Sequence, residues 1–215
     1  MNVCGLKTRL RSPEFEQFIQ NYDLICLTET KLSEIDNIAI SGFKSLKKNR
    51  KTLHRASGGV ALLLNENNPL CKHVNEMYVD SKDQLWVELH VPRSEKCIVL
   101  GIIYNPPDTS RYKDPNFFDN LESTLTNISS SSGDKSVILL GDFNARTGTL
   151  DDILENDNVN NNEDLNTKWY IEIANAAFKR TNTDTITNSN GPKLVEFCKN
   201  TNMIIIYGRC GNPKT

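Results

Sequence analysis

Short runs of apolar residues alternate along the chain with polar segments that carry turn and helix signals. Buried strands are expected over residues 24–27, 58–64, 97–103, 137–140 and 203–207, and a weaker strand over 38–43. Residues 84–91 alternate between apolar and polar positions, as a strand with one buried face does. Helices are expected after Ser12-Pro13, after Asp114-Pro115 and over residues 191–199, where apolar residues recur three and four positions apart.

This order of elements predicts an α/β fold. Some strands are joined by short links, which indicates a mixed sheet, or two sheets packed face to face, with helices outside. A length of 215 residues favours one domain over residues 1–215. The first strand is expected to be reduced to its last residues near Asn2, and the Asn/Asp-rich residues 150–190 are expected to form a surface insert.

Polar side chains follow the apolar run 137–140. Gly141 interrupts the run, and Asp142 and Asn144 stand two positions apart, so they point to the same side of an extended chain. A carboxylate can accept a proton or hold a hard cation, and an amide can donate to an anionic oxygen. An ordinary turn is the alternative for this segment, since Gly, Asp and Asn are common turn residues.

Two further strand ends carry reactive groups. Glu29 follows the run 24–27 within the sequence Thr-Glu-Thr, and Tyr104 ends the run 97–103 before Asn105-Pro106-Pro107. For Glu29 alone, a capping or solvated carboxylate is the alternative. Together with Asn2 and the Asp142/Asn144 pair, these residues predict polar groups at the ends of four strands.

The formal net charge of −2 gives no global attraction to nucleic acid. Residues 44–55 are a basic exception that contains no acid. Such a run is either a solvated loop or a local phosphate-binding patch. The candidate phosphate contacts in it are Lys47, Lys48, Arg50, Lys51 and Arg55.

The six cysteines show neither a CxxC motif nor a metal-binding spacing. Cys97 is expected to be a small buried residue, and His90 an ordinary outward-facing strand residue. The cysteine pattern suits a reducing compartment. No secretory signal region and no apolar run of membrane-spanning length is present, so a nuclear or cytoplasmic location is expected, neither secreted nor in a membrane.

Five segments together resemble the endonuclease/exonuclease/phosphatase superfamily, which has the DNase I-like fold. They are NVCGL, LICLTET, GGVALLL, GIIYNPP and VILLGDFN. Within that superfamily, GDFNARTGTL, NGPKLVEFC and IIIYGRCG are most similar to the endonuclease domains of non-LTR, LINE-type retrotransposons. The resemblance implies a four-layer sandwich, with two mixed sheets packed face to face and helices outside.

The resemblance also implies Mg²⁺-dependent cleavage of DNA, with Mn²⁺ as a possible substitute. Glu29 would hold the metal with support from Asn2, and Tyr104 would contact the scissile phosphate or assist at the leaving group. Asp142 would orient or deprotonate the attacking water, and Asn144 would bind the phosphoryl oxygens. Arg146 joins the expected DNA contacts. A monomer is expected, with a reverse transcriptase in the same full-length reading frame as a possible partner.

In the family, a Ser-Asp-His motif and an Asp that precedes it are expected late in the domain. This sequence contains no Asp-His dipeptide and lacks both features. The fold is therefore expected to be incomplete and the activity impaired. A catalytically inactive remnant or binding module is one alternative function. A phosphatase acting on lipid headgroups is the other, because a shared fold does not fix the substrate.

Overall fold

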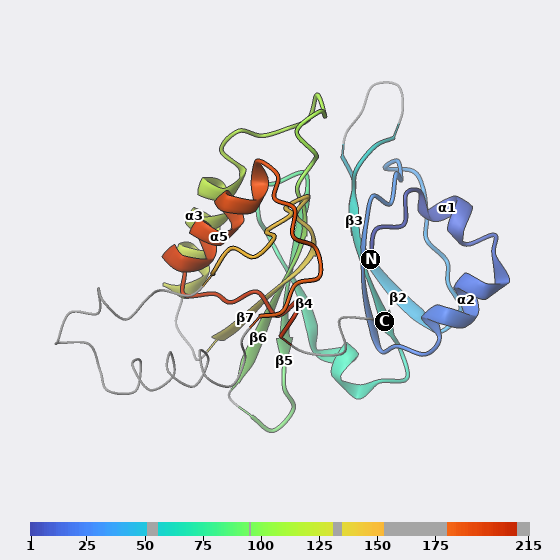
Figure 1. The fold of residues 1–215 in the computed structure, drawn as a ribbon. Coiled ribbons are helices and arrows are strands. Elements are labelled where there is room, and N and C mark those ends of the chain that lie inside the picture. Colours follow the sequence, from blue (N-terminus) through green and yellow to red (C-terminus); the bar gives the residue numbers. More distant parts are fainter. Residues whose placement is uncertain (51–55, 95, 131–134, 153–179, 210–215) are drawn as a thin grey trace. The chain divides into compact units, whose positions relative to one another are not determined.

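The computed structural model describes residues 1–50, 56–94, 96–130, 135–152 and 180–209 (Figure 1). The chain forms two compact units. The first contains residues 1–114 and 126–144, and the second contains residues 115–125 and 145–215. No helix among the described residues is long and apolar enough to cross a membrane.

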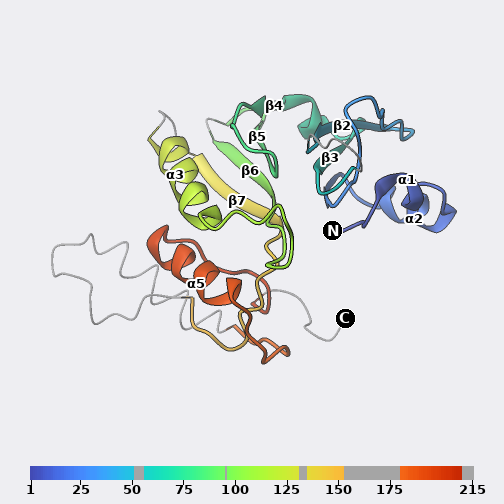
Figure 2. The ribbon, with the colours of Figure 1, turned by 90° about the horizontal axis from the view of Figure 1, so that it is seen from above.

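The first unit contains two β-sheets (Figures 1 and 2). The three-stranded sheet has the order β1-β3-β2, with antiparallel pairs formed by β1 (Leu24–Thr28), β3 (Val60–Asn65) and β2 (Phe43–Lys48). The four-stranded sheet has the order β4-β5-β6-β7, formed by β4 (Val74–Met77), β5 (Gln84–His90), β6 (Cys97–Tyr104) and β7 (Lys135–Asp142). Its pairs are antiparallel except for the parallel pair β6–β7.

Helical segments occur at five places along the described chain. They are α1 (Leu6–Arg9), α2 (Pro13–Ile19), the 3₁₀ helix η1 (Pro69–His73), α3 (Phe117–Ser129) and α5 (Asn190–Asn200). The predicted start of α2 is confirmed, because the Ser12 hydroxyl accepts a hydrogen bond from the Phe15 N–H and Pro13 occupies the first turn.

The two sheets pack face to face around one hydrophobic core. Alternate residues of β3, β5 and β6 point into it, because side chains in a strand alternate between the two faces. Its buried members include Leu62, Leu64, Leu85, Val87, Leu100 and Ile102. A second cluster, which includes Leu6, Ile19, Leu27 and Leu63, covers the other face of the three-stranded sheet with α1 and α2. The predicted α/β fold with two packed sheets is confirmed.

Strand β7 lies at the edge of the four-stranded sheet in the described part of the chain. The sequence predicts a strand buried on both faces, but Ile138 and Leu140 are 44% and 36% exposed. They stand beside Leu100 and Ile102 of β6, which are buried in the core between the sheets. Within the described residues, β7 is thus an edge strand, which is why its apolar side chains remain accessible.

Three predicted segments take other forms. The weak strand predicted over residues 38–43 is reduced to the isolated bridge Ile40–Phe43 and to Phe43 as the first residue of β2. Strand β2 extends through Lys48, so the first part of the basic run is neither a loop nor free of secondary structure. Residues 203–207 do not form a strand in the described part of the chain. The Ile205 N–H bonds instead to the Asp152 carboxylate, so a side chain takes the place of a neighbouring strand.

The second unit contains α5 and residues 117–125 of α3. The helix predicted over residues 191–199 is confirmed, and Phe197 and Cys198 are buried in it. The rings of Phe118 and Phe197 lie 6.1 Å apart, which packs the two helices together. Most of the expected insert, residues 153–179, lies outside the described residues. The single-domain prediction stays a prediction, as does that of the insert.

Candidate active site

The amide of Asn2 joins two carboxylates that are far apart in sequence. Its Nδ2 donates to Glu29 Oε1 at 3.0 Å and to Asp142 Oδ2 at 2.9 Å. Its Oδ1 accepts the Cys4 backbone N–H at 3.1 Å, which fixes the orientation of the amide. A parallel bridge between Asn2 and Thr28 holds this residue beside the end of β1.

Glu29 receives a second donor from the other sheet. The Tyr104 hydroxyl donates to Glu29 Oε1 at 3.1 Å, and Lys31 Nζ lies 3.5 Å from Oε2. Burial favours the neutral acid, but the hydrogen bonds from Asn2 and Tyr104 and the charge of Lys31 outweigh it. The pKa of Glu29 is therefore lowered, and the carboxylate is charged at neutral pH.

Tyr104 stays protonated for related reasons. Burial and the adjacent negative charge of Glu29 raise the pKa of its phenol well above the ordinary value. The phenol is therefore a hydrogen-bond donor and not a base at neutral pH. Tyr104 and Asp142 occupy paired positions of β6 and β7, so the sheet register brings both to one edge.

The predicted pair Asp142/Asn144 forms a compact turn at the end of β7. The Asn144 N–H donates to Asp142 Oδ1 at 3.0 Å, and Asn144 Nδ2 donates to the Asn105 carbonyl at 2.7 Å. Asn105 is 2% exposed, and its own amide donates to the Phe143 carbonyl at 3.0 Å. In the sequence, Asn105 stands out only as the residue before two prolines, and no local signal indicates this positioning contact.

The backbone around these groups is unusual. Among the described residues, six non-glycine residues have positive φ, and four of them are Cys4, Glu29, Lys31 and Asn144. Left-handed backbone is unfavourable for residues with a Cβ and tends to persist where the surroundings impose it, often at functional sites. The hydrogen bonds described above bring together the predicted site residues Asn2, Glu29, Tyr104, Asp142 and Asn144. Their predicted catalytic roles stay predictions.

The predicted DNA contacts are more scattered. Lys47 Nζ bonds to the Asp36 carbonyl, and Lys48 Nζ bonds to the Val79 carbonyl. Arg50 is 5% exposed and forms an ion pair with Asp83. In the second unit, Arg146 makes a two-pronged ion pair with Asp184, with both contacts at 2.8 Å. Lys51 and Arg55 lie outside the described residues, and the DNA-binding role of all six stays a prediction.

The donor set fits a hard divalent cation. Mg²⁺ prefers oxygen ligands and is usually held by one or two carboxylates together with substrate phosphates. Glu29 offers an ionised carboxylate for this purpose, with Asp142 nearby across the Asn2 amide. The Asn2 carbonyl oxygen is engaged by Cys4, so Asn2 supports Glu29 in this structure as a hydrogen-bond donor.

Residues 1–193 match the endonuclease/exonuclease/phosphatase family, and the chain belongs to this family. Members of the family generally depend on a divalent metal ion. The comparison with curated proteins gives no match.

The chain is similar to several solved structures, of which the AP endonuclease from Leishmania major supports the fold. An AP endonuclease from Leishmania major is 19% identical, with a TM-score of 0.52 over 73% of this chain and 55% of that chain. A 3′ phosphatase from Neisseria bound to a product DNA hairpin is 19% identical, with a TM-score of 0.47 over 70% and 58%. An AP endonuclease from Archaeoglobus fulgidus is 16% identical, with a TM-score of 0.46 over 72% and 59%. The chain thus spans less than two thirds of the length of each of these structures.

Proposed function

We propose that this chain is a Mg²⁺-dependent endonuclease domain of LINE-type retrotransposon origin that nicks DNA. The observation that carries the proposal is the Asn2 amide, which joins Glu29 to Asp142 while Tyr104 donates to the same oxygen of Glu29. Family membership supports phosphodiester chemistry at this site. The segments GDFNARTGTL, NGPKLVEFC and IIIYGRCG support the retrotransposon origin.

Asp142 acts on the attacking water in this proposal. Each of its oxygens accepts one internal hydrogen bond, from Asn2 and from the Asn144 N–H, so the carboxylate is held in one orientation. Each oxygen has a further lone pair with which to accept a water proton. A fixed carboxylate within reach of water can act as a general base.

The remaining groups address the phosphate. The protonated Tyr104 hydroxyl is a donor positioned by Glu29, and Asn144 is held at the edge of the site through Asn105. Donors fixed in advance stabilise negative charge as it develops on phosphoryl oxygens. A Mg²⁺ ion on Glu29, or Mn²⁺ in its place, would neutralise further charge on those oxygens. We propose that the protein works as a nuclear or cytoplasmic monomer, with a reverse transcriptase in the full-length chain.

Nicking of supercoiled plasmid tests the proposal. Conversion to the open circle is expected with Mg²⁺ and is expected to stop in EDTA. The variants Glu29→Gln and Asp142→Asn keep the side-chain shape but remove the charge, and each is expected to lower the rate at least about 100-fold. Glu66→Gln and Asp80→Asn, at exposed acids outside the site, are the matched controls.

Three results would contradict the proposal. They are nicking that persists in EDTA, nicking that is unchanged in both site variants, and the absence of nicking under all metal conditions. DNA binding without any nicking would instead support the alternative of an inactive binding module.

A further inference from the structure

Three side chains of metal-binding type gather at the other end of the four-stranded sheet. Glu88 and His90 lie on β5, and Cys97 begins β6. Their ligand atoms all lie within 4.8 Å of one another. Cys97 and Tyr104 are the first and last residues of β6, and seven residues of strand span about 23 Å. The cluster is therefore separate from the candidate active site.

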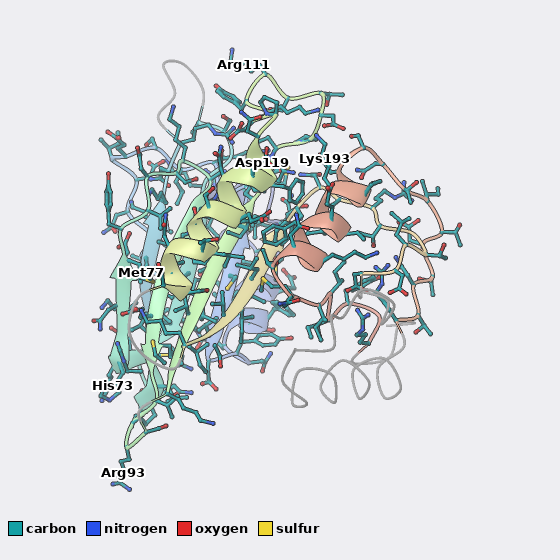
Figure 3. All side chains as sticks on the ribbon, turned by 90° about the vertical axis from the view of Figure 1, so that its left-hand side faces the viewer. His73, Met77, Arg93, Arg111, Asp119 and Lys193 are labelled. Carbon is teal, nitrogen blue, oxygen red and sulfur yellow. The ribbon has the colours of Figure 1, made fainter. Side chains whose placement is uncertain are left out.

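Figure 3 shows this separation along the sheet. Arg93 marks the connection from β5 to β6, and Arg111 lies in the segment that follows β6. The two labels stand at opposite ends of the first unit, with the strands running between them (Figure 3). The cluster lies toward Arg93, and the end of β6 that carries Tyr104 lies toward Arg111.

The strand ladder fixes the cluster in place. His90 and Cys97 are directly paired in the antiparallel register of β5 and β6. Glu88 precedes His90 by two residues, so both side chains leave β5 on the same face. Ligands presented by paired strands are more precisely held than ligands on a loop.

The Glu88 carboxylate is already oriented. Its Oε1 accepts from Lys135 Nζ at 2.9 Å, and its Oε2 lies 3.7 Å from His90 Nε2. Bonds of about 2.0–2.1 Å in a tetrahedral zinc site place nitrogen and oxygen ligands about 3.4 Å apart. A shift of a few tenths of an ångström would therefore let Oε2 and Nε2 bind the same ion. Lys135 would fix the carboxylate through its other oxygen.

The ligand set also selects the class of ion. A thiolate, an imidazole and a carboxylate suit Zn²⁺ and related transition metals, whereas Mg²⁺ prefers oxygen ligands. Cys97 is buried, but the His90 side chain is 51% exposed, which leaves one side of the cluster open to water. Three protein ligands with an open fourth position would result.

We propose that Glu88, His90 and Cys97 bind a Zn²⁺-class transition-metal ion. Binding exchanges the thiol proton of Cys97 for the metal, so that one proton leaves as the sulfur–metal bond forms. The ion would join β5 to β6, and Lys135 of β7 already holds the Glu88 carboxylate from a third strand.

Titration of the metal-free chain with Co²⁺ tests this site, because a thiolate ligand gives cobalt a near-ultraviolet charge-transfer absorption. One equivalent is expected to produce the band, Zn²⁺ is expected to abolish it, and excess Mg²⁺ is expected to leave it unchanged. Cys97→Ser is expected to eliminate the band. His90→Ala, at an exposed position that folding tolerates, is expected to weaken Co²⁺ binding at least tenfold.

Two control variants separate this site from other ligands. Cys4→Ser removes the thiol beside the candidate active site, and His73→Ala removes the other described histidine, which is exposed and labelled in Figure 3. Both are expected to keep the band and the affinity of the unaltered chain. No band at millimolar Co²⁺, a band that survives in Cys97→Ser, or a loss in either control as large as that in His90→Ala would overturn the proposal.

Discussion

Asn2 allows two carboxylates to share one edge of the fold. A backbone N–H can bond only to the oxygen of an amide, so the contact from Cys4 directs the nitrogen of Asn2 toward Glu29 and Asp142. Each acid then receives a donor, and their mutual repulsion is reduced. The Asn2 amide thus holds two carboxylates close together, which creates a region of negative charge suited to binding a cation.

Gly141 is the residue at which the candidate site tolerates least change. Its φ is +143°, and a Cβ at this position would lie 1.9 Å from the Ile103 carbonyl oxygen. Strand β6 would have to move away from β7 to admit it. Gly141→Ala is therefore expected to lower the free energy of unfolding by more than about 3 kcal/mol, in the upper range for single substitutions.

Gly42→Ala is the matched control in urea unfolding of the two variants. Gly42 also has positive φ, at +80°, but a Cβ there would meet nothing within 4 Å. Gly42→Ala is expected to lower the free energy of unfolding only by the cost of left-handed backbone, about 1–2 kcal/mol. Equal losses in the two variants would show that contact with Ile103 is not the cause.

Arg50 connects the end of β2 to the segment before β5. Its guanidinium forms an ion pair with Asp83 and stacks 4.3 Å from the centre of the Tyr112 ring. It also lies 5.9 Å from the centre of the Tyr104 ring. Burial raises the pKa of the Asp83 carboxyl against the opposing charge of Arg50. This geometry gives Arg50 an internal role that the basic run in the sequence did not suggest.

Arg50→Met is expected to destabilise the first unit by about 3 kcal/mol, because it leaves Asp83 partly buried without its partner. Thermal unfolding of the single variants and of the double variant Arg50→Met/Asp83→Leu measures the coupling between the two residues. The double variant is expected to recover part of the loss. If Arg50→Met left the stability unchanged but weakened DNA binding, Arg50 would instead be a residue that contacts phosphate.

The second unit has its own buried charge cluster. The Asp152 side chain is fully buried and bonds to Arg209 at 2.8 Å and to the Ile205 N–H at 2.7 Å, with Arg180 at 3.8 Å. Burial opposes ionisation, but the bonds from Arg209 and from the backbone outweigh it, and the pKa of Asp152 is lowered. This carboxylate takes the place of a neighbouring strand for residues 203–207.

A lowered folded-state pKa makes the contribution of Asp152 dependent on pH. The contribution is fully present above the unfolded value of about 3.9 and is lost as pH falls through the lower folded value. Asp152→Asn is expected to cost about 3–5 kcal/mol at pH 7, because it leaves buried arginines uncompensated. The difference in melting temperature between the two proteins is expected to shrink below about pH 4. A difference that stays constant from pH 7 to pH 3 would contradict this assignment.

Across the fold, the sequence predicts strands best where local pattern and packing agree. The alternation over residues 84–91 and the apolar run 97–103 correspond to β5 and β6. The expectation that β5 has a single buried face is only partly right, because Trp86 on its other face is also fully buried. Residues 203–207 are equally apolar, but a strand needs a partner, and no local pattern encodes one. The site residues at strand ends could be predicted because the apolar runs that mark the strands also mark where they end. The roles of Asn105 and Arg50 could not, because they depend on contacts with residues far away in the sequence.

The charge of the molecule limits how DNA binding can depend on salt. The formal net charge is −2, and the described residues among the predicted DNA contacts bond to backbone carbonyls or acids within the protein. Each phosphate neutralised by a cation contributes about −0.9 to the slope of log affinity against log salt for duplex DNA. Because Arg50 and Arg146 are already paired with acids, at most four of the six predicted cations are expected to neutralise phosphates, and we expect a slope no steeper than about −3.6.

Fluorescence anisotropy with a duplex oligonucleotide between 50 and 200 mM salt, conditions over which this electrostatic contribution changes strongly, measures that slope. The Asp142→Asn variant keeps the DNA intact during the titration. Arg146→Gln is expected to leave the slope unchanged, because Asp184 already holds the guanidinium. A slope near −5.4 would mean that all six predicted cations neutralise phosphates, Arg50 and Arg146 included, and the assignment of Arg50 to the interior of the first unit would then be wrong.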